Sequence, residues 1–196
     1  MNRVKDCLSN FTPMSNLKTD LRNFNKGDYS PGSSFKWALW FIFSSCFVRS
    51  YQLFYFLRAG VLRLFGAKIG KRVVLKPGLI VKFPWFLEIG NDVWLGEKVW
   101  LENQGAIKIG SSACISQGAV FMTGNHNYKK TTFDLMVQGI TIEEGVWIGA
   151  CAIVCPGVTC KSHSILTAGS VAADNLEAYS IYQGNPAVKI KDRIIS

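Results

Sequence analysis

Aliphatic side chains recur every six residues through most of the chain after Gly66. A second apolar series lies two residues before the first, and a small residue such as Gly70 or Gly90 often follows the main one. The repeat changes phase at residues 83–85 and again after residue 101, and it stops between residues 125 and 139. The main series consists of Ile69, Leu75, Val81, Ile89, Leu95, Leu101, Ile109, Ile115, Phe121, Ile142, Ile148, Val154, Cys160 and Leu166.

A period of six fits neither an α-helix nor the simple alternation of a strand. It is typical of a parallel β-helix, in which each six-residue unit forms one flat wall and three units close a triangular coil. The recurring aliphatic residue and the residue two positions earlier both point inward, because side chains alternate along a strand. Small residues then occupy the corners, where bulk is excluded. Stacked coils share a continuous apolar core that one coil could not form alone.

The first 65 residues have a different pattern, and we interpret them as an extension that precedes a β-helix domain at residues 66–196 with a short C-terminal tail. Residues 1–34 are polar, whereas residues 35–65 are rich in aromatic side chains and predict one or two helices. The uncharged stretch from Trp37 to Val48 has 12 residues, fewer than the roughly 17–25 of a membrane-spanning helix. Two roles remain open for residues 35–58: packing against the β-helix or another subunit, or lying on a membrane surface.

The net charge of +9 belongs to the N-terminal third of the chain. Residues 1–76 contain 13 Lys or Arg and 3 Asp or Glu, whereas residues 77–196 contain 9 and 10. A basic region can bind nucleic acid, but no nucleic-acid-binding motif accompanies this one. We therefore expect no nucleic-acid partner, and we expect an anionic membrane surface or an anionic substrate instead.

The segment at residues 125–139, where the repeat stops, holds His126, one of only two histidines. A loop carried on a rigid repeat is a common place for chemistry, and imidazole is well suited to proton transfer near neutral pH. His126 is therefore the candidate catalytic base, with an ordinary surface histidine as the alternative. The other histidine, His163, follows Lys161 and Ser162 in a corner-like run and is expected to be an ordinary exposed residue.

The cysteines and the N-terminus suggest a compartment. The six cysteines form no C-x-x-C pair and no Cys/His spacing that suits zinc. Residues 1–21 are polar and of mixed charge, unlike a secretory signal peptide. We expect reduced thiols and a cytoplasmic protein that could associate peripherally with the inner face of the plasma membrane.

Five runs of residues carry a more specific resemblance. They are Leu64-Phe65-Gly66-Ala67-Lys68-Ile69-Gly70, Phe83-Pro84-Trp85, Ile115-Ser116-Gln117-Gly118-Ala119, Thr123-Gly124-Asn125-His126-Asn127-Tyr128 and Gly184-Asn185-Pro186-Ala187. Over roughly residues 25–195, the chain resembles the hexapeptide-repeat acyltransferase superfamily. Within it, the chain is most similar to O-acetyltransferases of the colanic-acid and exopolysaccharide biosynthesis type, relatives of the galactoside and maltose acetyltransferases. The resemblance implies an all-β, left-handed parallel β-helix with an N-terminal helical or irregular extension, an excursion loop and a trimeric assembly.

The resemblance also implies roles for particular residues. His126 stands at the position of the catalytic histidine, and Asn103 at that of an asparagine that contacts the acceptor sugar; for Asn103, a corner residue bonded to its own turn is the alternative. Contacts to the cofactor are implied at Trp147, Ala150, Ala168 and Lys191. One departure concerns the Thr-Lys pair that relatives often carry after Ala-Gly-Ser, because this chain has Ala173 and Asp174 there.

The expected reaction is transfer of acetyl from acetyl-CoA to a hydroxyl of a carbohydrate acceptor, without a metal. A sugar hydroxyl is a weak nucleophile, and a general base is worth roughly 10²–10⁴ in rate. No Gly-x-Ser-x-Gly motif is present, so direct attack is expected. A zinc lyase on this fold would need three histidines per metal, and the chain has only two. The remaining alternative is a non-catalytic trimeric scaffold or membrane-binding module. We expect a homotrimer, with Trp94 and Trp100 exposed on one wall of the β-helix.

Overall fold

The computed structural model describes residues 17–50 and 57–196. Two parts of the predicted N-terminal extension, residues 1–16 and 51–56, lie outside the described residues. The described chain divides into two compact units. The larger consists of residues 28–125 and 136–196, and the smaller of residues up to 27 together with residues 126–135. Each unit is described by itself.

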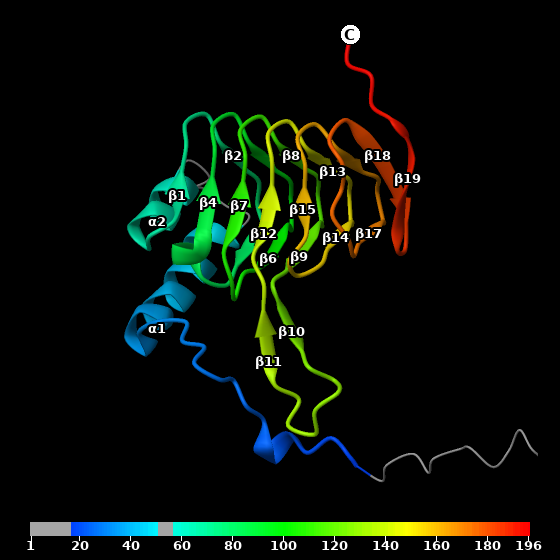
Figure 1. Ribbon diagram of the computed structural model, residues 1–196. Helices are drawn as coiled ribbons and strands as arrows, with labels where there is room; N and C mark the ends of the chain where they lie inside the picture. The colour runs from blue at the N-terminus through cyan, green and yellow to red at the C-terminus, as the bar shows by residue number, and fades with distance from the viewer. Residues whose placement is uncertain (1–16, 51–56) are drawn as a thin grey trace, which may run out of the picture. The chain divides into compact units, whose positions relative to one another are not determined.

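The larger unit is a parallel β-helix whose coils stack along one axis (Figure 1). Wall A contains β1 (Lys68–Ile69), β4 (Leu87–Ile89), β7 (Ile107–Ile109), β12 (Ile140–Ile142) and β15 (Thr159–Cys160). Wall B contains β2 (Val74–Leu75), β5 (Trp94–Leu95), β8 (Cys114–Ile115), β13 (Trp147–Ile148), β16 (Ile165–Leu166), β18 (Ser180–Gly184) and β19 (Ala187–Asp192). Wall C contains β3 (Ile80–Val81), β6 (Trp100–Glu102), β9 (Val120–Met122), β14 (Ile153–Val154) and β17 (Val171–Ala172).

The pairing register confirms the predicted period. Ile148 on wall B is opposite Leu166, eighteen residues later, which corresponds to three walls of six residues. The earlier coils are longer: Ile69 is opposite Ile89, twenty residues later. The two extra residues enter at the corner between walls C and A, where a short 3₁₀ turn, η4 (Pro84–Phe86), forms in the first coil. The predicted phase shifts are therefore corner insertions that leave the walls in register.

The inward positions form the core, as the repeat predicts. In each two-residue strand the second side chain points inward; Leu95, Ile148 and Leu166 have no exposed surface. Residues two positions earlier, such as Val93 and Val99, are equally buried. The predicted hexapeptide-repeat β-helix is confirmed, and its stability comes from this continuous apolar stack.

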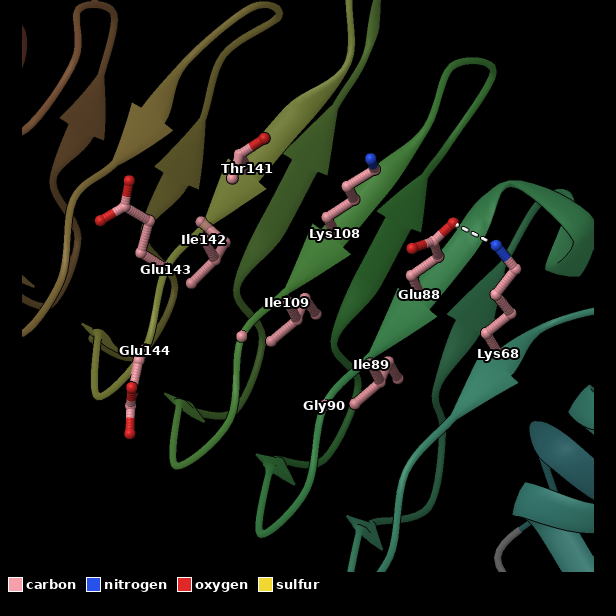
Figure 2. Close-up of a pocket in the computed structure, with 11 residues that line it drawn as sticks. Lys68, Glu88, Ile89, Gly90, Lys108, Ile109, Thr141, Ile142, Glu143 and Glu144 are labelled. Carbon is pink, nitrogen blue, oxygen red and sulfur yellow. Dashed lines mark hydrogen bonds and ion pairs between the residues drawn. The ribbon is translucent and has the colours of Figure 1, made fainter.

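The outward positions differ from wall to wall. On wall A the row across the strands is Lys68, Glu88, Lys108, Thr141 and Thr159, and Figure 2 shows the polar side chains directed away from the inward isoleucines. On wall B the row is Val74, Trp94, Cys114, Trp147 and Ile165, and on wall C it is Ile80, Trp100, Val120, Ile153 and Val171. The expectation that one wall carries both tryptophans is wrong. Trp94 and Trp100 are six residues apart, which places them on neighbouring walls.

The helices lie at the first coil of the β-helix (Figure 1). They are α1 (Ser34–Phe43), a π-helical turn η2 (Ser44–Val48) and α2 (Arg58–Leu64). The side chain of Trp40 is buried and donates from Nε1 to the carbonyl of Val81 at 3.0 Å. On α2, the buried Arg58 donates to the carbonyls of Leu75 and Ser50 at 3.0 and 2.8 Å. Among the described helices, none combines the length and apolar character needed to cross a membrane.

The smaller unit contains the tip of the predicted excursion loop. The loop is a β-hairpin of β10 (Gly124–His126) and β11 (Leu135–Val137). The N-terminal segment around η1 (Leu21–Asn23) binds its tip through backbone hydrogen bonds, from Asp20 N–H to the carbonyl of Thr131 at 2.8 Å and from Leu135 N–H to the carbonyl of Asn25 at 2.9 Å. The predicted excursion loop therefore contains a regular β-hairpin.

Candidate active site

The hairpin fixes the orientation of the His126 ring. Its imidazole stacks on the ring of Phe133, with centroids 4.4 Å apart and 7° between the planes, and the ring of Phe24 lies 5.7 Å away. The Nδ1 atom lies 3.1 Å from the carbonyl oxygen of Phe133. A carbonyl oxygen can only accept, so Nδ1 carries the proton in the neutral ring and Nε2 carries the lone pair. Nε2 is therefore the atom that could accept a proton.

Phe133 holds this carbonyl through an unusual backbone conformation. Its φ angle is 48°, a region that bulky residues seldom adopt. The next residue, Asp134, receives a hydrogen bond from Lys130 Nζ at 2.6 Å, and this bond holds the pKa of Asp134 below its ordinary value. Phe133 could not be recognised from the sequence, since the group that orients His126 is a backbone carbonyl and leaves no signature in the residue type.

Asn103 is buried at the corner between walls C and A. Its side chain has no exposed surface. Oδ1 accepts from the backbone N–H groups of Lys82 and Phe83 at 3.0 Å, and Nδ2 donates to the carbonyl of Phe83 at 2.6 Å. The amide thus satisfies the backbone where the first coil leaves its regular path. In this structure Asn103 braces an adjacent coil, and the acceptor contact implied by the resemblance stays a prediction.

Thr123 repeats this arrangement one coil further on. It is also fully buried, and its hydroxyl donates to the carbonyl of Glu102 at 2.9 Å while accepting from Gly105 N–H at 2.8 Å. Thr123 immediately precedes β10. The same corner therefore carries an insertion in each of three successive coils. Hydrogen bonds from the buried side chains of Asn103 and Thr123 stabilise the first two insertions. The third insertion is the hairpin, so its base at Asn125 belongs to this corner.

Three of the predicted cofactor residues line one groove on wall B. Trp147, Ala150 and Ala168 border a groove of about 400 Å³, together with Ser116, Gln117, Gly149 and the segment 165–167. The indole Nε1 of Trp147 donates to Ser116 Oγ at 3.0 Å, which orients the ring while leaving it half exposed. One large aromatic side chain beside two small alanines makes an apolar channel. Such a channel suits a slender ligand with few charges.

The small residues of this groove are required by the stacking of the coils. A Cβ atom added at Gly149 would lie 2.4 Å from the backbone nitrogen of Ala168, well inside van der Waals contact. Glycine therefore allows the two corners to approach. The predicted role of small corner residues holds here through close approach of backbones rather than through a left-handed conformation.

Lys191 lies on the same wall as this groove. In the register of wall B, Trp147 is opposite Ile165, Ile165 is opposite Ile181, and Ile181 is opposite Lys191. Three strand spacings of about 4.8 Å separate Trp147 from Lys191 along this row. The side chain of Lys191 is exposed, and Asp174 is exposed on the segment after wall C. Wall B thus carries Trp147 and Lys191, and Ala150 and Ala168 lie in the turns that follow its strands β13 and β16.

The described residues contain no group of three or more His, Cys, Asp or Glu arranged to hold a metal ion. His163, the second histidine, packs against Tyr179, with ring centroids 4.8 Å apart and the planes tilted by 35°. Arg193 donates to the backbone carbonyls of His163 and Gly145. His163 therefore belongs to the packing of the C-terminal coil.

Comparison with known proteins identifies the family. No protein-family model matches the chain. The chain is 38% identical over 178 residues to WcaF of Escherichia coli strain K12, named for an acetyltransferase role in colanic acid biosynthesis. This match covers 89% of the chain and 97% of the relative. The chain belongs to this acetyltransferase family. The predicted resemblance to hexapeptide-repeat acetyltransferases is confirmed, and the protein is an acetyltransferase.

Proteins of lower sequence identity share the fold. The galactoside O-acetyltransferase of E. coli strain K12 is 22% identical over 138 residues, 69% of this chain and 68% of that protein. A hexapeptide-repeat acetyltransferase of Vibrio cholerae, solved with acetyl-CoA, superposes with a TM-score of 0.76 at 20% identity over 89% of this chain and 98% of that chain. A galactoside acetyltransferase solved with coenzyme A gives 0.75 at 19% identity over 85% and 84%.

Proposed function

We propose that this acetyltransferase moves an acetyl group from acetyl-CoA to a sugar hydroxyl of an exopolysaccharide or of its nucleotide- or lipid-linked precursor, with His126 as the general base. The observation that carries the proposal is the contact between His126 Nδ1 and the carbonyl of Phe133. This contact selects the tautomer that a base needs. The name of the E. coli relative supports an exopolysaccharide acceptor.

His126 acts at the start of the reaction. Nε2 takes the proton of the acceptor hydroxyl as the oxygen attacks the thioester carbonyl of acetyl-CoA. A tetrahedral intermediate forms and collapses, the C–S bond breaks, and the thiolate of coenzyme A takes up the proton that His126 holds, which restores the neutral imidazole. The Phe133 carbonyl accepts a hydrogen bond from Nδ1–H throughout and stabilises the imidazolium that forms transiently. The acetyl group passes directly from sulfur to oxygen.

The groove on wall B is the proposed site of acetyl-CoA. Its apolar lining at Trp147, Ala150 and Ala168 suits the pantetheine arm, and Lys191 would lie near the phosphates of the nucleotide. Complexes of two family members with acetyl-CoA or coenzyme A support this second substrate. Ala173 and Asp174 supply no cation, so the proposal assigns the phosphate contact to Lys191.

A homotrimer is part of the proposal. The groove borders wall B, whereas Asn103 and Asn125 lie at the corner between walls C and A. One copy of the β-helix therefore holds the groove and this corner on different sides. A second copy that places its corner beside the groove of the first would bring them together, and three copies close such a head-to-tail ring.

The test compares matched substitutions of the two histidines. His126→Asn removes the base and should lower turnover by roughly two to four orders of magnitude. His163→Asn should keep turnover near that of the wild type, since this residue packs on Tyr179 and its φ of 58° suits asparagine. Turnover is measured as release of coenzyme A with repeat-unit oligosaccharides from the envelope polysaccharide, and mass spectrometry locates the acetyl ester.

Two further measurements separate a lost base from lost structure. The melting temperature and the KM for acetyl-CoA of His126→Asn should stay close to the wild-type values, because the residue lies outside the β-helix core. The wild-type rate should fall at acid pH, and this dependence should disappear in the variant. More than about a tenth of wild-type turnover in His126→Asn would contradict the assignment. Asn103→Ala then tests the acceptor contact: a raised acceptor KM at unchanged melting temperature supports it, whereas a lower melting temperature indicates only the brace.

A further inference from the structure

Helix α1 presents three apolar faces, and within the described residues only one of them is packed against the β-helix and α2. The packed face holds Trp40 and Phe43, whose rings lie 5.3 and 5.4 Å from that of Phe65. The second face holds Trp37 and Phe41, which border a groove of about 370 Å³ shared with Trp100. The third face has large side chains at i, i+4 and i+7. These are Phe35, Leu39 and Ile42, with exposed fractions of 74%, 37% and 59%.

This outward face is exposed although the helix is firmly held. Trp40 is buried and bonded to the carbonyl of Val81, and Val48 at the end of η2 has no exposed surface. The helix axis is therefore fixed by the packed face, and the apolar residues of the third face point into solvent. A soluble monomer seldom leaves such a contiguous apolar face uncovered. A surface of this kind requires an occupant.

The charge of the sequence on both sides of α1 points to the occupant. From residue 29 to residue 87 the chain has nine Lys or Arg and no Asp or Glu. Three of these cations pair with acids of the next coil: Lys68, Arg72 and Lys82. Arg58 is buried. The other five have no acidic partner within ion-pair distance in the described part of the chain: Lys36, Arg49, Arg63, Lys71 and Lys76.

We propose that α1 lies on an anionic lipid surface, with Phe35, Leu39 and Ile42 in the apolar layer and, at the headgroups, the five cations that have no acidic partner among the described residues. Apolar contact and attraction to anionic lipid together are what interfacial helices use. Helix α1 and η2 together span 15 residues, Ser34–Val48, or roughly 22 Å against a hydrocarbon core of about 30 Å. The contact therefore lies in the interface. It is independent of the acetyl-transfer chemistry proposed above.

The experiment is co-sedimentation of the full-length protein with vesicles. Vesicles of phosphatidylglycerol and phosphatidylcholine in equal parts should bind the wild type, and pure phosphatidylcholine should bind it at least about tenfold more weakly. Binding to the mixed vesicles should weaken as salt rises. Phe35→Ser/Leu39→Ser/Ile42→Ser should lower the partition coefficient at least about tenfold, since three apolar side chains leave the bilayer. The matched control is Ile194→Ser/Ile195→Ser, which removes exposed apolar side chains from the C-terminal tail and should bind like the wild type.

The alternatives give different results. If a second copy of the chain covers this face, the triple variant will lose oligomer mass in light scattering, and its vesicle binding will match that of the wild type. Equal binding to neutral and anionic vesicles, or no binding, also overturns the proposal. Circular dichroism and the melting temperature of the triple variant show whether it is folded. Arg49→Gln supplies a milder test, with an expected loss of roughly fivefold for one cation near the surface.

Discussion

Walls A and B of the β-helix are alike inside and unlike outside. Both bury isoleucine or leucine in the inward row, as Ile109 on wall A and Ile115 on wall B show. The outward row of wall A is polar, with the ion pair between Lys68 and Glu88 at one end (Figure 2), whereas that of wall B is apolar and includes half-exposed Trp94 and Trp147. Since both walls fold with the same interior, the fold does not need the apolar outward row.

We therefore attribute the difference between the outward rows of walls A and B to binding of a ligand or of another copy of the chain. Wall A also has a hollow of about 460 Å³, but charged side chains such as Glu143 and Glu144 line it (Figure 2), and water solvates such a surface well. The groove of wall B has a similar volume, and none of the residues that line it is charged. Exposing apolar side chains to water is unfavourable, and a ligand or another copy of the chain that covers them removes this cost. We interpret wall A as the solvent wall and wall B as the binding wall.

The largest expected effect is on assembly. Trp94→Glu places a charge in the apolar outward row of wall B, and burying three such charges in a trimer is costly. Light scattering should show the mass fall from three times 21.8 kDa to a single copy. The matched change on wall A, Thr141→Glu beside Lys108, should leave the trimer intact. Dissociation by Thr141→Glu, with an intact Trp94→Glu trimer, would reverse the assignment of the walls.

The interior should respond equally on both walls. Ile109→Ala and Ile115→Ala each empty a nearly fully buried site, and each should lower the free energy of unfolding by about 2–5 kcal/mol. Denaturant midpoints at fixed protein concentration measure the two losses. Values that differ by more than about 2 kcal/mol, beyond the usual spread from site relaxation, would show that the walls are unlike inside as well.

The sequence predicts the inward rows because they are periodic. The hexads repeat an apolar residue at the same phase, so a displacement such as that at Phe83 can be recognised as an insertion. The outward rows have no period, because their members face different partners. Trp94 and Trp100 therefore appeared to share a wall until the register placed them on walls B and C.

The site was less predictable than the fold for a related reason. The identity of His126 and the grouping of Trp147 with Ala150 followed from resemblance along the chain, whereas the contacts depend on folding. The Phe133 carbonyl that orients His126 has no side-chain signature. Asn103 is buried because it bonds to the insertion at Phe83 in the preceding coil, twenty residues earlier. Such a contact between coils cannot be read from the residues next to Asn103.

Cofactor binding gives a smaller effect on the same comparison. Trp147→Ala removes the aromatic side of the wall B groove and should raise the KM for acetyl-CoA about tenfold, equivalent to about 1.4 kcal/mol, with turnover little changed. Thr141→Ala on wall A should leave both constants unchanged. Initial rates over a range of acetyl-CoA concentrations measure them. A fall in turnover at constant KM would instead place Trp147 among groups that act on the transition state.

The smallest effect concerns acid stability near wall A. Hydrogen bonds from Lys68 and Arg72 hold the pKa of Glu88 and of Asp92 below their ordinary values. A lowered folded-state pKa stabilises the protein above the ordinary carboxyl range, and this contribution is lost as the pH falls through the folded-state pKa. The melting temperature of the wild type should thus fall between about pH 6 and pH 3, and Glu88→Gln/Asp92→Asn should reduce that fall slightly. Exposed ion pairs contribute little, so the variant should differ only modestly at about pH 6 and should converge with the wild type at the acid end.

Glu97→Gln, at an exposed glutamate with no ion pair in the described ranges, is the control and should follow the wild-type curve. A variant curve that stays parallel to the wild type across this range would show that the ion pairs add no pH-dependent stability, and that solvation alone explains the polar character of wall A.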